Sequence, residues 1–337
     1  MTVSITKPEF NLREKITELD KPTGLKGNEL MRSDTSQDAR DLISAGRRNL
    51  FDNGACEIKQ RGSSFSSAGW TADRWYMYAT GGTTTIETSS PPSGFTHYLQ
   101  AASATSSCIF SQGIELKNQG SAGQFKQGRI MTVSWYAKTT ATGGEMMRLN
   151  ASFRSASTSG TNSVSLTDPI NGYNLGGGDV HITNSWARYS RTFKINVSPH
   201  SSNKILVMQI RTPSGAIGTV SLTGFQCEFG SEPTEFEHRP YSQELLLAQR
   251  YYQVHDGHYL QVVSPSTGAT ADFYVTLPYW VPMNHAPDVT ESYTTSGATT
   301  NNLVTVTATK AKYSLRPTSA NTEIYVQADT LRLDAEL

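Results

Sequence analysis

The central stretch of this sequence reads Cys227-Glu-Phe-Gly-Ser-Glu-Pro-Thr-Glu-Phe-Glu-His-Arg-Pro-Tyr-Ser-Gln-Glu-Leu-Leu-Leu-Ala-Gln-Arg-Tyr-Tyr252. Its first half is predicted to run extended, because the residue before a proline avoids the α region. Pro240 and Ser242 then predict a helix over 241–253, with Ser242 as the N-cap. The residues at helical spacing are Leu245, Leu246, Gln249 and Tyr252. This stretch therefore closes one domain and links it to the next.

The residues before it, 50–240, carry the pattern of a β-sandwich. Apolar and polar side chains alternate in 130–137, 186–193, 204–211 and 219–228, which predicts strands with one buried face. Turns rich in Gly, Ser and Pro separate these segments. Many short strands joined by such turns favour two packed sheets.

The residues after it, 254–337, predict a smaller β domain. The expected strands are 259–263, 272–277, 302–307, 323–327 and a last one at 330–337. So small a set of strands leaves an exposed edge that has to be covered. We expect a neighbouring subunit of a homotrimer to cover it.

Residues 1–49 differ from the rest and predict an arm with two short helices. Leu12, Ile16 and Leu19 recur at helical spacing in the first, and the second is expected at 36–43. Helices this short are marginal alone. The arm either attaches the protein to a larger assembly or trimerises it, or it folds back on its own domain. The residues predicted to make the attachment are Phe10, Leu12, Ile16 and Leu19.

The composition of the chain argues against several classes of protein. The 337 residues hold 29 Lys plus Arg and 29 Asp plus Glu, so no strong overall field favours nucleic acid or an anionic membrane. No apolar run is long enough to cross a bilayer, and the first residues lack a signal-peptide core. We expect a protein that is made in a cytoplasm and is released by lysis if at all. Cys56, Cys108 and Cys227 are expected to be buried free thiols.

Two blocks of the sequence resemble a known module. The first block contains the segments 53–62 and 70–75, and the second is 226–252. Together they resemble a module of bacteriophage tail-fibre and other virion appendage proteins. The openings at 7–16 and 27–34 resemble those of marine podovirus virion proteins. The module resemblance covers about residues 50–253. It implies a carbohydrate-binding-module-like jelly roll in a structural virion protein, with no established catalytic residues.

The densest cluster of aromatic and charged residues lies at 70–76. Aromatic faces stack on sugar rings, and Asp and Arg hydrogen-bond hydroxyl groups. A glycan site is therefore one interpretation of Trp70, Asp73, Arg74 and Tyr76. The other is structural, with Trp75 in the core and Asp73 and Arg74 holding the start of a strand.

Other candidate chemistry is weaker. His255 and His258 flank Asp256 and Gly257, but a turn explains this spacing without a metal. Glu228, Glu232, Glu235 and Glu237 lie in an extended, exposed lead-in, which does not suit the paired carboxylates of a glycosidase. We expect no enzyme, no cofactor and no metal.

The sequence thus predicts a mostly β structural protein of a tailed phage, a tail fibre or similar appendage involved in host attachment. Its expected partners are other virion proteins, copies of itself and a host surface glycan, and its expected location is the virion. One alternative is a capsid or tail decoration protein that binds no glycan. Another is a polysaccharide-degrading tail enzyme.

Overall fold

The computed structural model describes residues 48–66, 68–79, 81–102, 107–116, 124–155, 161–164, 166–167, 179–199, 201, 203–212, 218–263, 272–296, 298–317 and 323–336. The chain divides into two compact units, residues 1–48 and 49–337. The expected arm helices and the attachment residues Phe10, Leu12, Ile16 and Leu19 lie outside the described residues and stay predictions.

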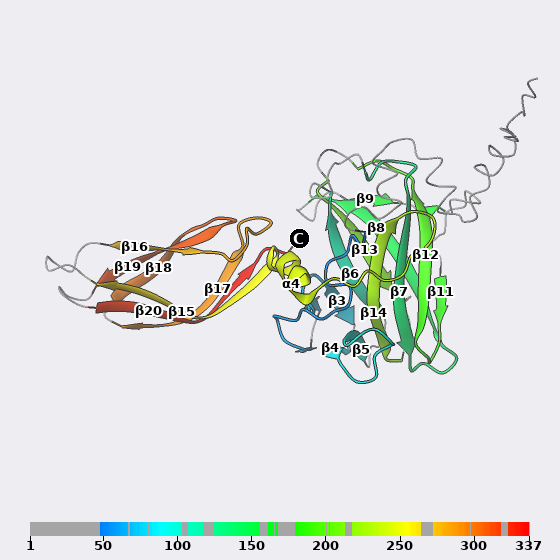
Figure 1. Cartoon of the computed structure of the whole chain (residues 1–337), viewed down its shortest axis with the longest axis horizontal. Coiled ribbons are helices and arrows are strands. Elements are labelled where there is room, and N and C mark those ends of the chain that lie inside the picture. The colour runs from blue at the N-terminus through cyan, green and yellow to red at the C-terminus, as the bar shows by residue number, and fades with distance from the viewer. Residues whose placement is uncertain are drawn as a thin grey trace, which may run out of the picture. The chain divides into compact units, whose positions relative to one another are not determined.

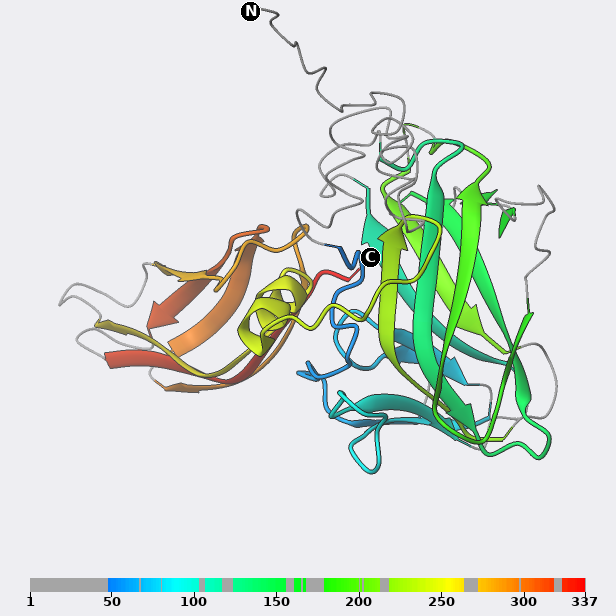
Figure 2. The same cartoon turned by 45° about the vertical axis from the view of Figure 1, so that its right-hand side comes forward.

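Two antiparallel sheets, here named sheet A and sheet B, form a jelly-roll sandwich (Figures 1 and 2). Sheet A has the order β1 (Ser64–Phe65), β4 (Thr83–Glu87), β5 (Tyr98–Ala102), β14 (Val220–Phe229), β7 (Ile130–Thr139), β12 (Ala187–Ile195) and β10 (Leu166–Thr167). Sheet B has the order β11 (Asp179–Ile182), β8 (Glu145–Arg154), β13 (Ile205–Arg211), β6 (Cys108–Glu115), β3 (Tyr76–Ala79) and β2 (Gly69–Trp70), with β9 (Thr161–Val164) also on β8.

Helix α4 (Tyr241–Gln249) and two smaller antiparallel sheets follow. Sheet C has the order β15 (Tyr252–Val263), β20 (Glu323–Asp334) and β17 (Asp288–Ser296). Sheet D has the order β16 (Phe273–Pro278), β19 (Lys310–Pro317) and β18 (Ala298–Val306). The mostly β fold predicted from the sequence, with its jelly-roll sandwich, is confirmed.

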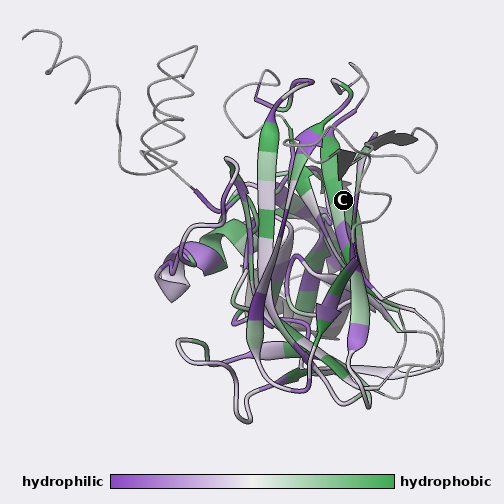
Figure 3. Cartoon of the chain, turned by 90° about the vertical axis from the view of Figure 1, so that its right-hand side faces the viewer, coloured by the Kyte–Doolittle hydropathy of each residue, from purple (hydrophilic) through white to green (hydrophobic). Residues whose placement is uncertain are grey.

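Alternation along the strands makes the core of the sandwich. In β7 the buried apolar positions are Met131, Val133, Trp135 and Ala137, and in β8 they are Met147, Leu149, Ala151 and Phe153. Because successive side chains of a strand point to opposite faces, each sheet presents one apolar face to the other. Figure 3 shows the resulting changes between hydrophobic and hydrophilic residues along the strands.

Trp75 lies in this core, as predicted. Its ring packs 4.0 Å from that of Phe225 and 5.3 Å from that of Phe51, measured between centroids. Its indole Nε1 donates to the carbonyl oxygen of Asn53 at 2.9 Å. The indole therefore has a partner for its only polar atom, as a buried tryptophan needs.

A tight turn at residues 53–58 explains the first of the two recognised blocks. Asn53 has a positive φ of 52°, and its side chain accepts from the backbone N–H of Ile58 while donating to the carbonyls of Ile58 and Asp73. A Cβ on Gly54 would lie 2.3 Å from the carbonyl oxygen of Phe225. Glycine at position 54 is thus required by the close approach of β14.

The lead-in between β14 and α4 lies against the outer face of sheet A. Gln226 donates to the carbonyls of Thr234 and Glu235, and Thr192 donates to the carbonyl of Ser231. Phe236 packs against Phe95 with ring centroids 5.0 Å apart. Figure 1 shows this segment in yellow, crossing sheet A on its way to α4. The lead-in therefore covers part of sheet A.

The start and end of the linking helix differ from the prediction. Helix α4 begins at Tyr241 after Pro240, with no side-chain cap, so Ser242 is not the N-cap. The backbone N–H groups of Gln243 and Glu244 donate to the Pro240 carbonyl instead. The helix ends at Gln249, and Tyr252 belongs to β15 because it pairs with Asp334.

Three further expectations are wrong. Glu228 is not in an exposed lead-in: it belongs to β14 and is buried, because its carboxylate accepts from Gln226 and Thr234. Residues 255–258 form no turn, since β15 pairs with β20 along its length. The same pairing makes one strand, β20, out of the two expected at 323–327 and 330–337.

The three cysteines are free and buried, as predicted. Burial raises the pKa of the Cys56 and Cys227 thiols well above the usual value. Within the described residues, no helix combines the length and the hydropathy that crossing a membrane would require.

The contact at Gly54 makes a testable prediction. Replacing Gly54 by Ala puts a methyl group onto the Phe225 carbonyl, so we expect a loss of about 1–3 kcal/mol in the free energy of unfolding, measured by urea denaturation. Gly69→Ala is the matched control, since a Cβ there meets nothing within 4 Å. Equal unfolding midpoints for the two variants would contradict this account of the turn.

Candidate functional site

The outer face of sheet B carries exposed aromatic side chains. Tyr76 and Tyr78 alternate with the buried Met77 and Ala79 on β3, and they are 37% and 38% exposed. On the neighbouring strand β2, the half-buried Trp70 meets Tyr76 edge to face, with ring centroids 5.5 Å apart. Two of the predicted glycan-binding residues, Trp70 and Tyr76, thus lie together on this face.

The strand register extends this face with polar side chains. Tyr76 is paired with Ser111 on β6, which is paired with Gln209 on β13, which is paired with Asn150 on β8. A second row runs from Tyr78 through Ile109 and Arg211 to Arg148 and Asp179. We call this surface the sheet B platform, defined by Trp70, Tyr76, Tyr78, Arg148, Asn150, Asp179, Gln209 and Arg211.

Burial of the intervening residues fixes which way the platform residues face. Phe110, Leu149, Met208 and Ile210 alternate with them and are buried in the core of the sandwich. The residues Gln209, Arg211, Asn150 and Arg148 are only partly buried. The platform thus combines aromatic rings with amide, guanidinium and carboxylate groups on one face of the sheet.

A partly exposed ion pair lies at one end of the platform. Arg148 Nε donates to Asp179 Oδ1 at 2.9 Å, and the two side chains are 38% and 32% exposed. This hydrogen bond holds the pKa of Asp179 below its usual value. Both groups are therefore charged at neutral pH and accessible to hydroxyl groups of a ligand.

The other two predicted site residues are buried. Arg74 is 1% and Asp73 0% exposed, so neither presents its side chain to a ligand on the surface. Arg74 has a positive φ of 74°, a conformation that costs about 1–3 kcal/mol in a residue with a side chain. Its contacts therefore have to hold it there, and the structural interpretation of these two residues is the one the geometry supports.

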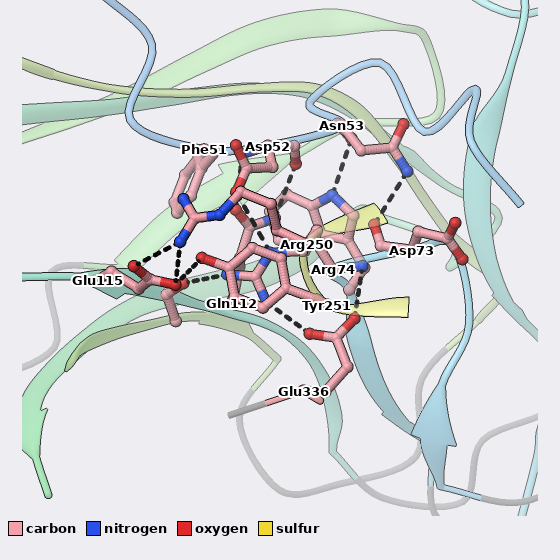
Figure 4. A network of polar contacts seen from close by, with 12 residues as sticks. Phe51, Asp52, Asn53, Asp73, Arg74, Gln112, Glu115, Arg250, Tyr251 and Glu336 are labelled. Atoms are coloured by element: carbon pink, nitrogen blue, oxygen red, sulfur yellow. Dashed lines mark hydrogen bonds and ion pairs between the residues drawn. The ribbon is translucent and has the colours of Figure 1, made fainter. Parts of the chain in front are cut away.

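Arg74 lies at the centre of a buried polar network (Figure 4). Its guanidinium donates to Asp52 at 3.2 Å, to the Gly113 carbonyl at 2.7 Å and to Glu336 at 2.5 Å. It also lies 3.3 Å from the centroid of the Tyr251 ring. A buried charge is costly unless it is paired and hydrogen-bonded. Acidic groups from either end of the described chain provide that pairing.

Neighbouring contacts extend the network. Tyr251 donates its hydroxyl to Glu115, which also pairs with Arg250 at 3.4 Å. Arg61 stacks on Tyr252, with its guanidinium carbon 3.5 Å from the ring centroid, and pairs with Asp334 at 3.3 Å. These contacts fasten residues 250–252 and 334–336 to the sandwich. Sequence reasoning expected local hydrogen bonds for Asp73 and Arg74, whereas the partners of Arg74 are distant in sequence.

Burial shifts the pKa of two acids here. It raises the pKa of Asp73 to about 6, against the opposing hydrogen bond from Gln60 and the charge of Arg61. Asp73 Oδ2 accepts from Gln60 at 2.6 Å, while Oδ1 is buried with no hydrogen-bond partner among the described residues. Burial likewise raises the pKa of Glu336, although Arg74 opposes this.

Of the two histidines in the motif, the structure describes the side chain of His255. His255 is buried, stacks on Trp280 with centroids 4.2 Å apart, and its Nε2 lies 3.0 Å from Gln253 Oε1. In the parts of the chain that the structure describes, no group of three or more His, Cys, Asp or Glu side chains could hold a metal ion.

Sequence reasoning missed most of the platform. Tyr78 repeats the alternation of Tyr76 and could have been included from spacing alone. Gln209, Arg211, Asn150, Arg148 and Asp179 could not, because their proximity follows from the register between strands that are distant in sequence.

No family model and no curated protein matches this sequence. Several solved structures are similar to this chain, with low sequence identities and low TM-scores. The xylan-binding CBM22-1 domain of Paenibacillus barcinonensis Xyn10C is 11% identical, with 56% of this chain and 99% of that chain covered and a TM-score of 0.35. TmCBM61, solved with β-1,4-galactotriose, is 15% identical, with 55% and 100% covered and a TM-score of 0.31.

The enzymatically active domain of bacteriophage CBA120 tailspike protein 4 is 14% identical, with 54% of this chain and 21% of that chain covered and a TM-score of 0.34. Similarities at this level carry no argument about ligand or activity. What this chain binds has to be argued from its own residues.

The Arg74 network predicts a large effect of a single change. Arg74→Met removes the ion pairs that the buried Asp52 and Glu336 make with Arg74, and Glu336 keeps only the longer one to Arg61 at 3.4 Å. We therefore expect a loss of about 3–5 kcal/mol in the free energy of unfolding. Arg316→Met is the control, because its ion pair with Asp272 is largely exposed and should matter little. If Arg74→Met does not fold, Glu336→Gln tests the same network. Wild-type denaturation midpoints in both variants would contradict it.

The pKa of Asp73 predicts a dependence of stability on pH. Because burial raises it from 3.8 to about 6, the folded protein binds a proton that the unfolded chain has released between these values. Stability is therefore lost as pH rises from about 4 to 6.

The test compares wild type with Asp73→Asn by thermal unfolding at several pH values. The stability of wild type relative to the variant should fall across this window. Asp179→Asn is the control, because the lowered pKa of Asp179 gives a stabilisation that is fully present above the unfolded value of 3.8. The difference in stability between wild type and this variant should therefore stay constant across the window. Parallel pH profiles for wild type and Asp73→Asn would contradict the assignment.

Proposed function

We propose that this chain is a virion appendage protein of a tailed bacteriophage and that it binds a surface glycan on the sheet B platform. The observation that carries the glycan part is the pair of exposed tyrosines, Tyr76 and Tyr78, beside Trp70 and in register with polar side chains. Aromatic faces cover the apolar CH face of a sugar, while amide and guanidinium groups hydrogen-bond its hydroxyls.

The difference between the two outer faces of the sandwich supports the same site. The outer face of sheet A is partly covered by the chain's own lead-in, which Gln226 and Thr192 hold in place. On the outer face of sheet B, the tyrosines and the Arg148–Asp179 pair remain accessible. Accessible aromatic side chains next to polar groups with fixed positions are what small-molecule and sugar sites use.

The appendage part rests on the resemblance carried by 53–62, 70–75 and 226–252. In this proposal the N-terminal arm attaches the protein to the particle, three copies assemble, and several weak glycan contacts act together. Such multivalency gives strong attachment without a strong single site. Electron microscopy of antibody-labelled particles tests it: a fibre labels outside the head, whereas a decoration protein labels the head in a lattice. A native mass of one chain would contradict the trimer.

We also propose binding without catalysis. Four buried acids, Asp52, Glu115, Glu228 and Glu336, are each engaged by hydrogen bonds from Arg, Tyr, Gln or Thr side chains. A fifth, Asp73, accepts one from Gln60 and is closed to the surface. Acids held in this way act as structural partners. Release of reducing ends from a host polysaccharide by the purified chain, abolished by changing a pair of carboxylates, would overturn this part.

The platform predicts a specific loss of binding. In the full chain, Tyr76→Ala with Tyr78→Ala removes the stacking surface, and we expect the affinity for the best ligand of a glycan panel to fall about tenfold or more, that is by about 1.4 kcal/mol. The variant should still fold, with a loss in the free energy of unfolding of about 0.5–1.5 kcal/mol for the edge-to-face contact between Tyr76 and Trp70. Tyr241→Ala, a tyrosine 57% exposed on α4, is the matched control. Retained affinity in the double variant would exclude the platform as the site.

A further inference from the structure

The outer face of sheet D has an unusual charge distribution. Between Glu291 and Glu323 the sequence contains Lys310, Lys312 and Arg316 and no acidic residue, although cations and acids balance over the whole chain. All three cations belong to β19, the central strand of sheet D. The excess of positive charge is therefore a local feature of this sheet.

Alternation along β19 places these cations on one face. Ala311, Tyr313 and Leu315 are buried in the core between the small sheets, and the residues between them point outward. At a rise of about 3.4 Å per residue, the row from Lys310 to Arg316 is roughly 20 Å long. Arg316 pairs with Asp272 at 2.7 Å, which reduces the charge at that end only.

The neighbouring strands add an aromatic ring and hydroxyl groups to this face. Tyr274 on β16 is 56% exposed, and the ammonium of Lys312 lies 4.1 Å from its ring centroid. Lys312 is in register with Thr276 on one side and Thr305 on the other, and Tyr274 is in register with Ser314. Ser314 itself is buried. We call the accessible residues the sheet D face: Tyr274, Thr276, Thr305, Lys310, Lys312 and Arg316.

We propose that the sheet D face binds an anionic polysaccharide, a polymer that carries a carboxylate or sulfate at regular intervals. The row of cations matches repeated negative charges, and the exposed tyrosine offers a stacking surface for a sugar ring. The hydroxyls of the exposed Thr276 and Thr305 suit sugar hydroxyl groups. A nucleic acid fits less well, because one tyrosine and three cations provide little for its bases and dense phosphates.

This site is separate from the sheet B platform, because it lies on other strands and depends on charge. The platform carries two arginines, Arg148 and Arg211, of which Arg148 is paired with Asp179, and its other five residues are aromatic or uncharged. Failure of the sheet D face would therefore leave the proposed function standing, and the reverse also holds.

The experiment measures binding of the full chain to alginate and heparin by calorimetry, with neutral dextran and duplex DNA as comparisons. We expect binding to at least one of the two polyanions and none to dextran. Because two or three charges are neutralised, a fourfold rise in salt should lower the affinity roughly tenfold. Lys310→Ala with Lys312→Ala should also lower it at least tenfold, and Tyr274→Ala should lower it without changing the dependence on salt.

Two controls isolate the site. Lys194→Ala with Lys204→Ala removes two exposed lysines of the sandwich and should leave polyanion binding intact. Tyr76→Ala with Tyr78→Ala should also leave it intact, and this variant separates the two proposals.

The proposal is overturned if neither polyanion binds, if the Lys310 and Lys312 double variant binds like wild type, or if DNA binds more tightly than both polysaccharides. It is also overturned if that variant changes the native mass and not the polyanion affinity, since the face would then contact a second copy.

Discussion

The burial of one positive charge is the constraint on which the rest of this structure depends. Arg74 sits in a backbone conformation that disfavours any side chain, in a position closed to water. Such a charge is tolerated only if acidic groups reach it. Asp52 lies near the start of the sandwich and Glu336 near the end of the described chain, so one guanidinium requires both ends of residues 49–337 to be folded and in place. The network therefore links the folding of the sandwich to that of the C-terminal strands.

That linkage also determines which surfaces remain available. The lead-in follows sheet A to reach α4, and Tyr251 and Tyr252 follow α4 directly into the network and into β15. Hydrogen bonds from Gln226 and Thr192 hold the lead-in on sheet A between these two ends. The tyrosines of β3 lie on the other sheet, which the lead-in does not cover, and they therefore stay exposed. A side chain that is costly to expose persists on a surface more readily when it has a use there.

The sequence allowed the strand pattern, the buried cysteines and the place of Trp75 to be predicted, because each depends on local alternation or on residue type. Prediction from the sequence failed where pairing between residues distant in sequence determines the structure. Tyr252 has helical spacing, yet it joins a strand because β20 is there to pair with it. Glu228 looks exposed in a polar stretch, yet Thr234 folds back onto it. The platform could not be assembled from sequence for the same reason, since the register of β3, β6, β13 and β8 joins residues that no local pattern relates.

The net charge of the whole chain is a poor guide to what each of its surfaces can bind. On sheet B the accessible charges are partly compensated by the Arg148–Asp179 pair, so recognition there would depend on ring stacking and hydrogen bonds, which salt hardly affects. On sheet D the cations outnumber the acids, and interactions between exposed charges are screened over about 10 Å at 0.1 M salt. If both proposals hold, one chain carries two surfaces that respond differently to salt. A binding assay at a single ionic strength would then detect one surface more strongly than the other. Measuring binding over a series of salt concentrations separates their contributions.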